Sequence, residues 1–314
     1  MIKKPVVAIV IALVALAAVL VVGWKFRQQG KPATAVVAAD AGKQVSAPRE
    51  DVPKVNAEHA QAAPKVVPNS ITDKFAKSVD LSNFISENTA AAKTGNGKAA
   101  QLIASAYAEC ATVGADGNSY VDFMSTTIGK GITDSARLSA FQAALRAQAA
   151  RCATLNANKP SPGTLKSWSD LAASEGDLSS KVSTIDPMKN ANVKQGDVQG
   201  VIKDIVAAKD GDAMAKLGSV MATVGSDQAA TYGKYSGTPS SVYVWQLASC
   251  SFGADCSSGG TMLKSICLSS GFCGYASLED VYRDLLPPVQ FNEIVKEEVA
   301  LVGALQQGDL NALY

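Results

Sequence analysis

Six cysteines are the residues of this chain whose type and spacing could most readily do chemistry. Four of them form two C-x5-C pairs near the C-terminus, and the other two lie earlier in the chain. Zinc sites made of four cysteines usually use closer pairs, with two to four residues between the ligands, and thiol redox motifs use C-x-x-C. We therefore expect disulfides in preference to a metal or redox centre. The cysteines are Cys110, Cys152, Cys250, Cys256, Cys267 and Cys273.

The pairing of these cysteines follows only in part from the sequence. Four C-terminal cysteines allow three connectivities, and the sequence alone does not choose among them. We expect each to bond to its partner in the same C-x5-C pair, because consecutive antiparallel helices place the end of one beside the start of the next. Cys110 and Cys152 lie near the ends of the first and third of three consecutive predicted helices, so we expect them to pair; two buried free thiols are the alternative.

Most catalytic machinery is missing from the chain. The single histidine, His59, excludes Ser-His-Asp and Cys-His nucleophilic arrangements as well as histidine metal sites. The S-x-x-K, G-x-S-x-G, G-x-G-x-x-G and P-loop motifs do not occur either. We therefore predict no catalytic, cofactor-binding or metal-binding residue and no cofactor.

Acidic residues at helical spacing are the remaining candidates for chemistry. Two carboxylates can hydrolyse a glycosidic bond when one is protonated and the other is ionised. On a charged helix face such residues are usually only solvated, and nothing in the sequence marks a site. These groups are Glu279 and Asp280 with Asp284, and Glu293 with Glu297 and Glu298.

The N-terminus has the composition of a membrane anchor followed by a tether. Residues 5–23 are nineteen residues without a charge, which is about the length needed to cross a bilayer core of ~30 Å. We expect residues 1–27 to form an uncleaved signal-anchor; a cleaved signal peptide, with a shorter apolar region, is the rival. Residues 28–69 are rich in alanine and proline and predict a disordered linker. Because paired cysteines favour an oxidising compartment, we expect the C-terminal part in the periplasm of a bacterium, anchored in the inner membrane.

The rest of the chain predicts an all-α fold, either a helical bundle or a short helical-repeat solenoid stapled by disulfides. Apolar residues recur at helical spacing through a first region, 70–157, and a second region, 158–314. Helix caps are expected at Ser70, Ser119, Asp197 and Ser277. A last helix is expected from Gln290, with Phe291, Ile294, Val295, Val299, Val302 and Leu305 on its apolar side.

A short junction pattern recurs between the predicted helices. It has the form A-x-x-G-[DN], in which the glycine ends one helix and the next residue caps the following helix. It occurs at Gly176-Asp177 and Gly211-Asp212, with looser copies at Gly95-Asn96 and Gly308-Asp309. The two central copies lie 35 residues apart and resemble the junctions of tetratricopeptide and Sel-like helical repeats.

The amino-acid sequence of the C-terminal cysteine segment shows a second resemblance. W-x-L-A-x-C-x-x-G-x-D-C-S from Trp245, followed by C-x-x-x-G-x-C from Cys267, is similar to C-terminal segments of uncharacterised proteobacterial envelope proteins. This resemblance implies a location and an architecture but no activity.

The charge balance excludes nucleic acid as a partner. The formal net charge is +1 and aromatic residues make up 6%, so the chain has neither a basic stripe nor a stacking platform. We expect a non-enzymatic envelope protein that binds or scaffolds another envelope protein on a helical groove. The alternatives are a periplasmic enzyme acting on cell-wall glycan through acidic residues, and a structural spacer.

Overall fold

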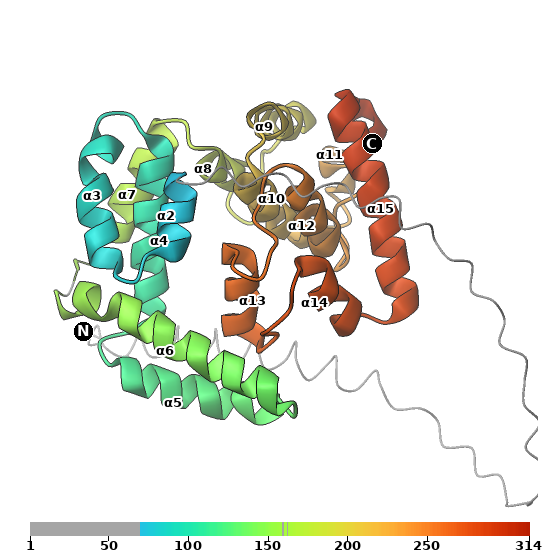
Figure 1. The fold of residues 1–314 in the computed structure, drawn as a ribbon. Helices are drawn as coiled ribbons and strands as arrows, with labels where there is room; N and C mark the ends of the chain where they lie inside the picture. Colours follow the sequence, from blue (N-terminus) through green and yellow to red (C-terminus); the bar gives the residue numbers. More distant parts are fainter. Residues whose placement is uncertain (1–69, 159, 162) are drawn as a thin grey trace, which may run out of the picture. The chain divides into compact units, whose positions relative to one another are not determined.

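The computed structural model describes residues 70–314, apart from residues 159 and 162 (Figure 1). They form helices and no strand, which confirms the predicted all-α class. None of the helices described is long and apolar enough to cross a membrane. The predicted span 5–23, the predicted linker 28–69 and His59 lie outside the described residues.

The helices are mostly short and are separated by tight turns. In chain order they are α2 (Ile71–Lys77), α3 (Leu81–Lys93), α4 (Gly97–Val113), α5 (Gly117–Thr127), α6 (Ser135–Ala157), α7 (Thr164–Ser174), α8 (Leu178–Val182), α9 (Gln195–Ala208), α10 (Gly211–Thr223), α11 (Ala229–Tyr232), α12 (Ser241–Ser251), α13 (Thr261–Ser270), α14 (Leu278–Leu285) and α15 (Pro288–Gln307).

Each helix packs mainly against one or two neighbouring helices. α3 packs on α4 and α4 on α7; further along, α8 packs on α10, α10 on α12 and α12 on α15. α5 and α6 lie side by side as a hairpin, and α13 reaches α6 from the C-terminal half (Figure 1). α7 follows the predicted boundary at residue 158, yet it packs against α4, so the regions 70–157 and 158–314 contact each other extensively.

Three apolar clusters form the interior. The largest lies among the helices from α8 to α15 and includes Trp245, whose Nε1 donates to the Tyr235 carbonyl at 2.9 Å. The second joins α2, α3, α4, α6 and α7. The third is small: Phe141 and Leu145 of α6 pack there against Cys267 and Cys273. This third cluster is where α13 is fixed to α6.

The predicted caps are half right. Ser70 accepts the Asp73 N–H and Ser277 accepts the Asp280 N–H, as expected. The cap predicted at Ser119 is wrong, because the N-cap of α5 is Asp116, whose side chain accepts the Asn118 N–H. The cap predicted at Asp197 is also wrong: Asp197 lies inside the first turn of α9, where its carboxylate accepts the N–H of Lys194, the true N-cap.

The last helix also differs from the expectation. α15 begins at Pro288, two residues before the predicted start, because proline lacks the N–H that a first helical residue leaves unpaired and already has a helical φ. Val299, predicted on the apolar side, is 47% exposed. Four of the other five residues on that side are buried, and Val295 is partly buried.

The junction pattern holds at three of its four places. Gly95, Gly176 and Gly308 have positive φ, and Asn96, Asp177 and Asp309 cap the helix that follows. At the fourth place the prediction is wrong, because the helix junction lies before Gly211-Asp212. There Lys209 has the left-handed conformation (φ 51°) and Asp210 is the cap, so Gly211 is the first residue of α10.

Gly211 is required for a different reason. A Cβ at this position would lie 2.0 Å from the backbone nitrogen of Ala254, in the turn after α12, and 2.7 Å from the backbone oxygen of Ser249, in the last turn of α12. At the start of α4, a Cβ on Gly97 would likewise lie 2.9 Å from the Glu175 carbonyl oxygen at the end of α7. In each pair, the absence of a side chain lets a helix start directly against the end of its neighbour.

The six cysteines pair as expected. The sulfur atoms lie 2.04 Å apart in Cys110–Cys152, 2.03 Å in Cys250–Cys256 and 2.01 Å in Cys267–Cys273. The long-range pair joins α4 to α6, and the other two close the ends of α12 and α13. No free cysteine remains in the part of the chain that the structure describes.

Candidate functional site

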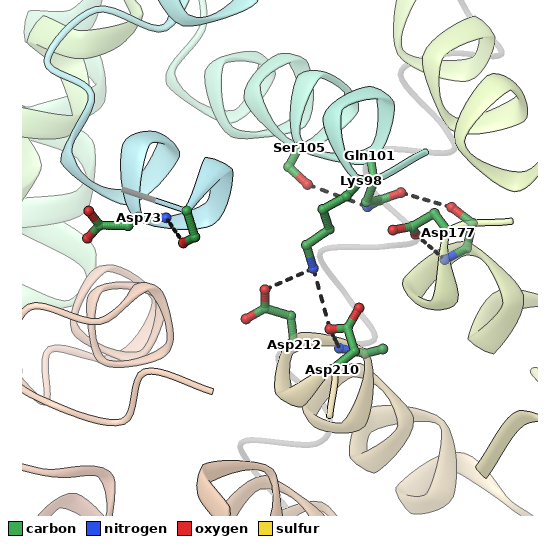
Figure 2. A network of polar contacts seen from close by, with 10 residues as sticks. Asp73, Lys98, Gln101, Ser105, Asp177, Asp210 and Asp212 are labelled. Atoms are coloured by element: carbon green, nitrogen blue, oxygen red, sulfur yellow. Dashed lines mark hydrogen bonds and ion pairs between the residues drawn. The ribbon is translucent and has the colours of Figure 1, made fainter. Parts of the chain in front are cut away.

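Three helix N-termini meet around one lysine side chain (Figure 2). Asn96 caps α4, Asp177 caps α8 and Asp210 caps α10, and each side chain accepts a backbone N–H from the first turn of its helix. Lys98 is the second residue of α4 and points toward the start of α10. The junction pattern of the sequence thus brings distant turns together in space.

The Lys98 ammonium holds α4 to α10. Its Nζ lies 3.0 Å from Asp212 Oδ2 and 3.4 Å from Asp210 Oδ1, and the lysine side chain is 25% exposed. Burial by itself would lower the pKa of Lys98, but Asp212 and Asp210 outweigh it and the pKa is raised. The lysine therefore stays protonated and paired at neutral pH.

A second set of polar contacts joins α4 to α8. The Ser180 hydroxyl donates to Gln101 Oε1 at 3.0 Å, and Gln101 Nε2 lies 3.5 Å from the Ser105 oxygen. Asp177 is 6% exposed and accepts the Ser180 N–H at 2.7 Å. Burial raises the pKa of Asp177, although the Ser180 N–H and the Lys98 charge both act to lower it.

The cleft beside Lys98, of about 660 Å³, is lined by the carboxylates of Asp73, Glu175, Asp177, Asp210, Asp212 and Asp255. Asp210 and Asp212 are ion-paired with Lys98, and Asp177 is committed to its helix. Hydrolysis of a glycoside needs one protonated and one free carboxylate facing each other across the substrate. No group of three or more side chains suited to hold a metal ion occurs among the described residues. The cleft lies at the junction where α4, α8 and α10 begin.

The acidic groups singled out in the sequence lie on α14 and α15. Glu279 and Asp280 pair with Arg283, and Asp284 accepts from Arg137 Nη2 at 3.0 Å. The exception is Glu298, whose pKa is raised to about 7, mainly by burial and also by the Glu279 charge. Neither of these two glutamates lines the cleft or the cavities described below.

A different cavity lies between α6 and α13, and we call it the α6–α13 groove. It encloses about 510 Å³, which is in the size range of ligand-binding pockets. Val79, which precedes α3, also lines it and is 85% exposed. Its apolar lining is formed by Ala76, Val79, Ala140, Ala144, Ala147, Ala150, Leu263, Cys267, Leu268, Phe272 and Cys273.

Two predicted disulfide residues thus take part in the groove. Cys267 and Cys273 are 8% and 4% exposed, and their bond holds the end of α13 against α6. The other four predicted residues, which form Cys110–Cys152 and Cys250–Cys256, do not line it. The structure therefore brings only one of the three disulfides to the candidate site.

A second apolar hollow of about 550 Å³ adjoins the groove. Phe123 lines it and is 60% exposed, and Phe75, Tyr120 and Met124 contribute to its walls. The two cavities share four lining residues, namely Gln148, Arg151, Lys264 and Leu268. We call these two cavities together the double groove.

Of the two shared cationic side chains of the double groove, Arg151 has a carboxylate partner and Lys264 has none within the described part of the chain. Arg151 is 9% exposed; its Nε pairs with Glu109 Oε1 at 3.1 Å and its Nη2 donates to the Phe75 carbonyl at 3.0 Å. Burial raises the pKa of Glu109 and lowers that of Arg151, and each charge partly opposes the shift of the other. Lys264 is exposed, donates to the Ala76 carbonyl at 2.6 Å, and forms no ion pair with the residues described.

Sequence reasoning did not identify the double groove. A signal was present: Ala140, Ala144 and Ala147 recur at helical spacing in α6. The larger apolar residues of the same helix, Phe141, Leu145 and Cys152, are buried. A stripe of small residues beside an apolar stripe marks a surface that another element can approach closely, but the sequence does not say which element does so.

Comparison with known proteins adds no identification. No protein-family model matches the chain, and neither the curated proteins nor the solved structures contain a match.

Proposed function

We propose that this chain is a non-enzymatic protein-binding module of the bacterial envelope, and that the double groove is its binding surface. The observation that carries the proposal is an apolar concavity with exposed Val79 and Phe123 in its lining. Large exposed apolar side chains gathered at a hollow are typical of interaction sites, whereas isolated ones are ordinary surface. In the Lys98 cleft, in contrast, Asp210 and Asp212 are ion-paired and Asp177 caps its helix.

The location belongs to the same proposal. Residues 5–23 anchor the chain in the inner membrane, residues 28–69 act as the tether, and the helical part lies in the periplasm, either as a bundle or as a short solenoid. Support comes from the uncharged run of nineteen residues and from three cysteine pairs at bonding distance. The pairwise packing of successive helices and the recurring junctions favour the solenoid.

Site-specific crosslinking tests the binding surface. Ala147 lines the groove and is exposed, while Ala143 lies one turn earlier on the same helix, is also exposed and lines neither cavity. A photo-crosslinking residue placed at 147 in the full chain, in its native membranes, should capture a defined protein that the same residue at 143 does not capture. Val79→Arg, which puts a charge at the apolar edge of the groove, should abolish the capture at 147.

Two outcomes would refute the proposal. Equal capture at positions 147 and 143 would mean that the groove is not the contact surface. Capture at 147 that survives Val79→Arg would mean that the apolar edge does not contribute.

Protease accessibility tests the location. Protease added after the outer membrane is opened should digest residues 70–314. Complete protection of these residues behind an intact inner membrane would reverse the assigned orientation.

A further inference from the structure

The double groove has an uneven charge pattern that restricts what can occupy it. The cationic side chains in its lining are Lys77, Arg151 and Lys264, and the acid in its lining is Glu109. Glu109 is already paired with Arg151, and Lys77 is paired with Asp73 at 2.8 Å. Among the described residues that line the double groove, this leaves Lys264 as the cation without a carboxylate partner.

Lys264 occupies the place where the two cavities meet. It lines both of them, together with Leu268 one turn later on α13. The apolar walls of one cavity come from α6 and α13, and those of the other come from α5 and from Phe75. An occupant that fills both cavities must therefore pass the Lys264 ammonium between two apolar contacts.

The Lys264 ammonium has N–H donors available for a further partner. An ammonium group has three N–H donors, and the Ala76 carbonyl accepts from the group at 2.6 Å. Partial burial and the neighbouring Arg151 guanidinium lower the pKa of Lys264, although Glu109 and Asp255 act in the opposite direction. An added negative charge at this point would therefore be favourable, and it would not need to displace an existing ion pair.

We propose that the double groove binds a protein segment that places a carboxylate between two apolar side chains, with the carboxylate on Lys264 and one apolar side chain in each cavity. This inference depends on the proposed function, whose groove it uses, and it adds the chemistry of the partner. One uncompensated cation calls for one negative charge, which distinguishes this partner from polyanions such as nucleic acid. The apolar walls supply the affinity, and the single ion pair supplies register and selectivity.

Selection of peptides by the full-length protein tests this inference. Random twelve-residue peptides displayed on phage are selected on the detergent-solubilised full chain, and bound phage that Val79→Arg no longer retains are the groove binders. The expected groove binders carry Asp or Glu flanked on both sides by apolar residues. Their affinity should fall about 3- to 10-fold in Lys264→Met, as expected for loss of one partly exposed ion pair.

Matched variants separate charge from packing. Lys264→Arg keeps the charge and should retain most of the affinity, whereas Lys264→Glu should reject the acidic peptides and accept versions in which the acid is replaced by Lys. Lys203→Met, at an exposed lysine outside the double groove, should change nothing. Urea denaturation of each variant checks that the fold is retained.

The outcomes distinguish this inference from the proposed function. Groove binders without an acidic residue, or with an affinity insensitive to Lys264→Met and Lys264→Glu, would overturn the inference and leave a protein-binding groove in place. Failure to obtain any binder sensitive to Val79→Arg would overturn both. Binding of a fatty-acid probe such as palmitate in place of any peptide would also overturn both, because the occupant would then be an amphiphile.

Discussion

The close contact of α10 with α12 gives the sharpest quantitative prediction. In Gly211→Ala, the new Cβ would lie 2.0 Å from the Ala254 nitrogen and 2.7 Å from both the Ala254 Cα and the Ser249 oxygen. Real Cβ atoms essentially never approach other heavy atoms closer than 3.0 Å, so one of the two helices must move by about an ångström. All three contacts are backbone atoms, and a rotamer change cannot relieve them.

We expect Gly211→Ala to lower the free energy of unfolding by about 3 kcal/mol, at the upper end of the usual cost of overpacking. The matched control is Gly303→Ala in α15, where a Cβ meets no heavy atom within 4 Å. That control should gain about 0.5–1 kcal/mol, because alanine restricts the unfolded chain without strain in the folded one.

Urea denaturation of the full chain, followed by circular dichroism at 222 nm, measures both variants against the wild type. The reasoning about α10 and α12 would be refuted if Gly211→Ala were as stable as the wild type, or if it gained stability as Gly303→Ala does. An intermediate loss shared by both variants would also contradict it, since only one of the two sites is crowded.

Three further predictions concern charges and disulfides. Lys98→Met should lower the free energy of unfolding by about 2 kcal/mol because two carboxylates lose their shared cation; unchanged stability in urea would contradict this. Replacing Cys110 and Cys152 by serine should lower the free energy of unfolding by about 4 kcal/mol, whereas replacing either short disulfide should lower it by about 2 kcal/mol, because the long-range bond closes a longer loop. Urea denaturation under non-reducing conditions measures these losses. Equal losses for the three disulfides would contradict the chain-entropy model. Glu298 has its pKa raised from 4.5 to about 7, so the wild type should lose stability as the pH rises between these values. Glu298→Gln should remove about 1 kcal/mol of that loss, after allowance for solvent screening. Parallel profiles of stability against pH for the two proteins would contradict this prediction.

The fold class and many helix ends were predictable because they depend on local sequence. Ser70 and Ser277 cap their helices through contacts with residues three positions away, and the pattern that reveals them is equally short. The local disulfides followed from the same reasoning, since each joins residues six positions apart. Local signals fail where two of them compete: at 209–211 the glycine attracted the junction pattern, while Lys209 adopts the left-handed conformation and Asp210 is the cap.

The candidate site was not predictable because it depends on contacts between distant segments. Lys264 contacts Ala76 across 188 positions of sequence, and Lys98 reaches Asp212 across 114. No periodicity encodes such distances. The alanine stripe of α6 marked a close approach, but the walls opposite it come from α13, and nothing in the sequence connects these two helices.

The order of the disulfides along the chain has a consequence for how the protein matures. Six cysteines allow fifteen connectivities, and the observed one joins the first to the second, the third to the fourth and the fifth to the sixth. A chain that is oxidised as it emerges, from its N-terminus onward, meets each partner before the next cysteine arrives. Native pairing is therefore also the pairing that vectorial synthesis favours, and the finished protein needs no disulfide reshuffling to reach it.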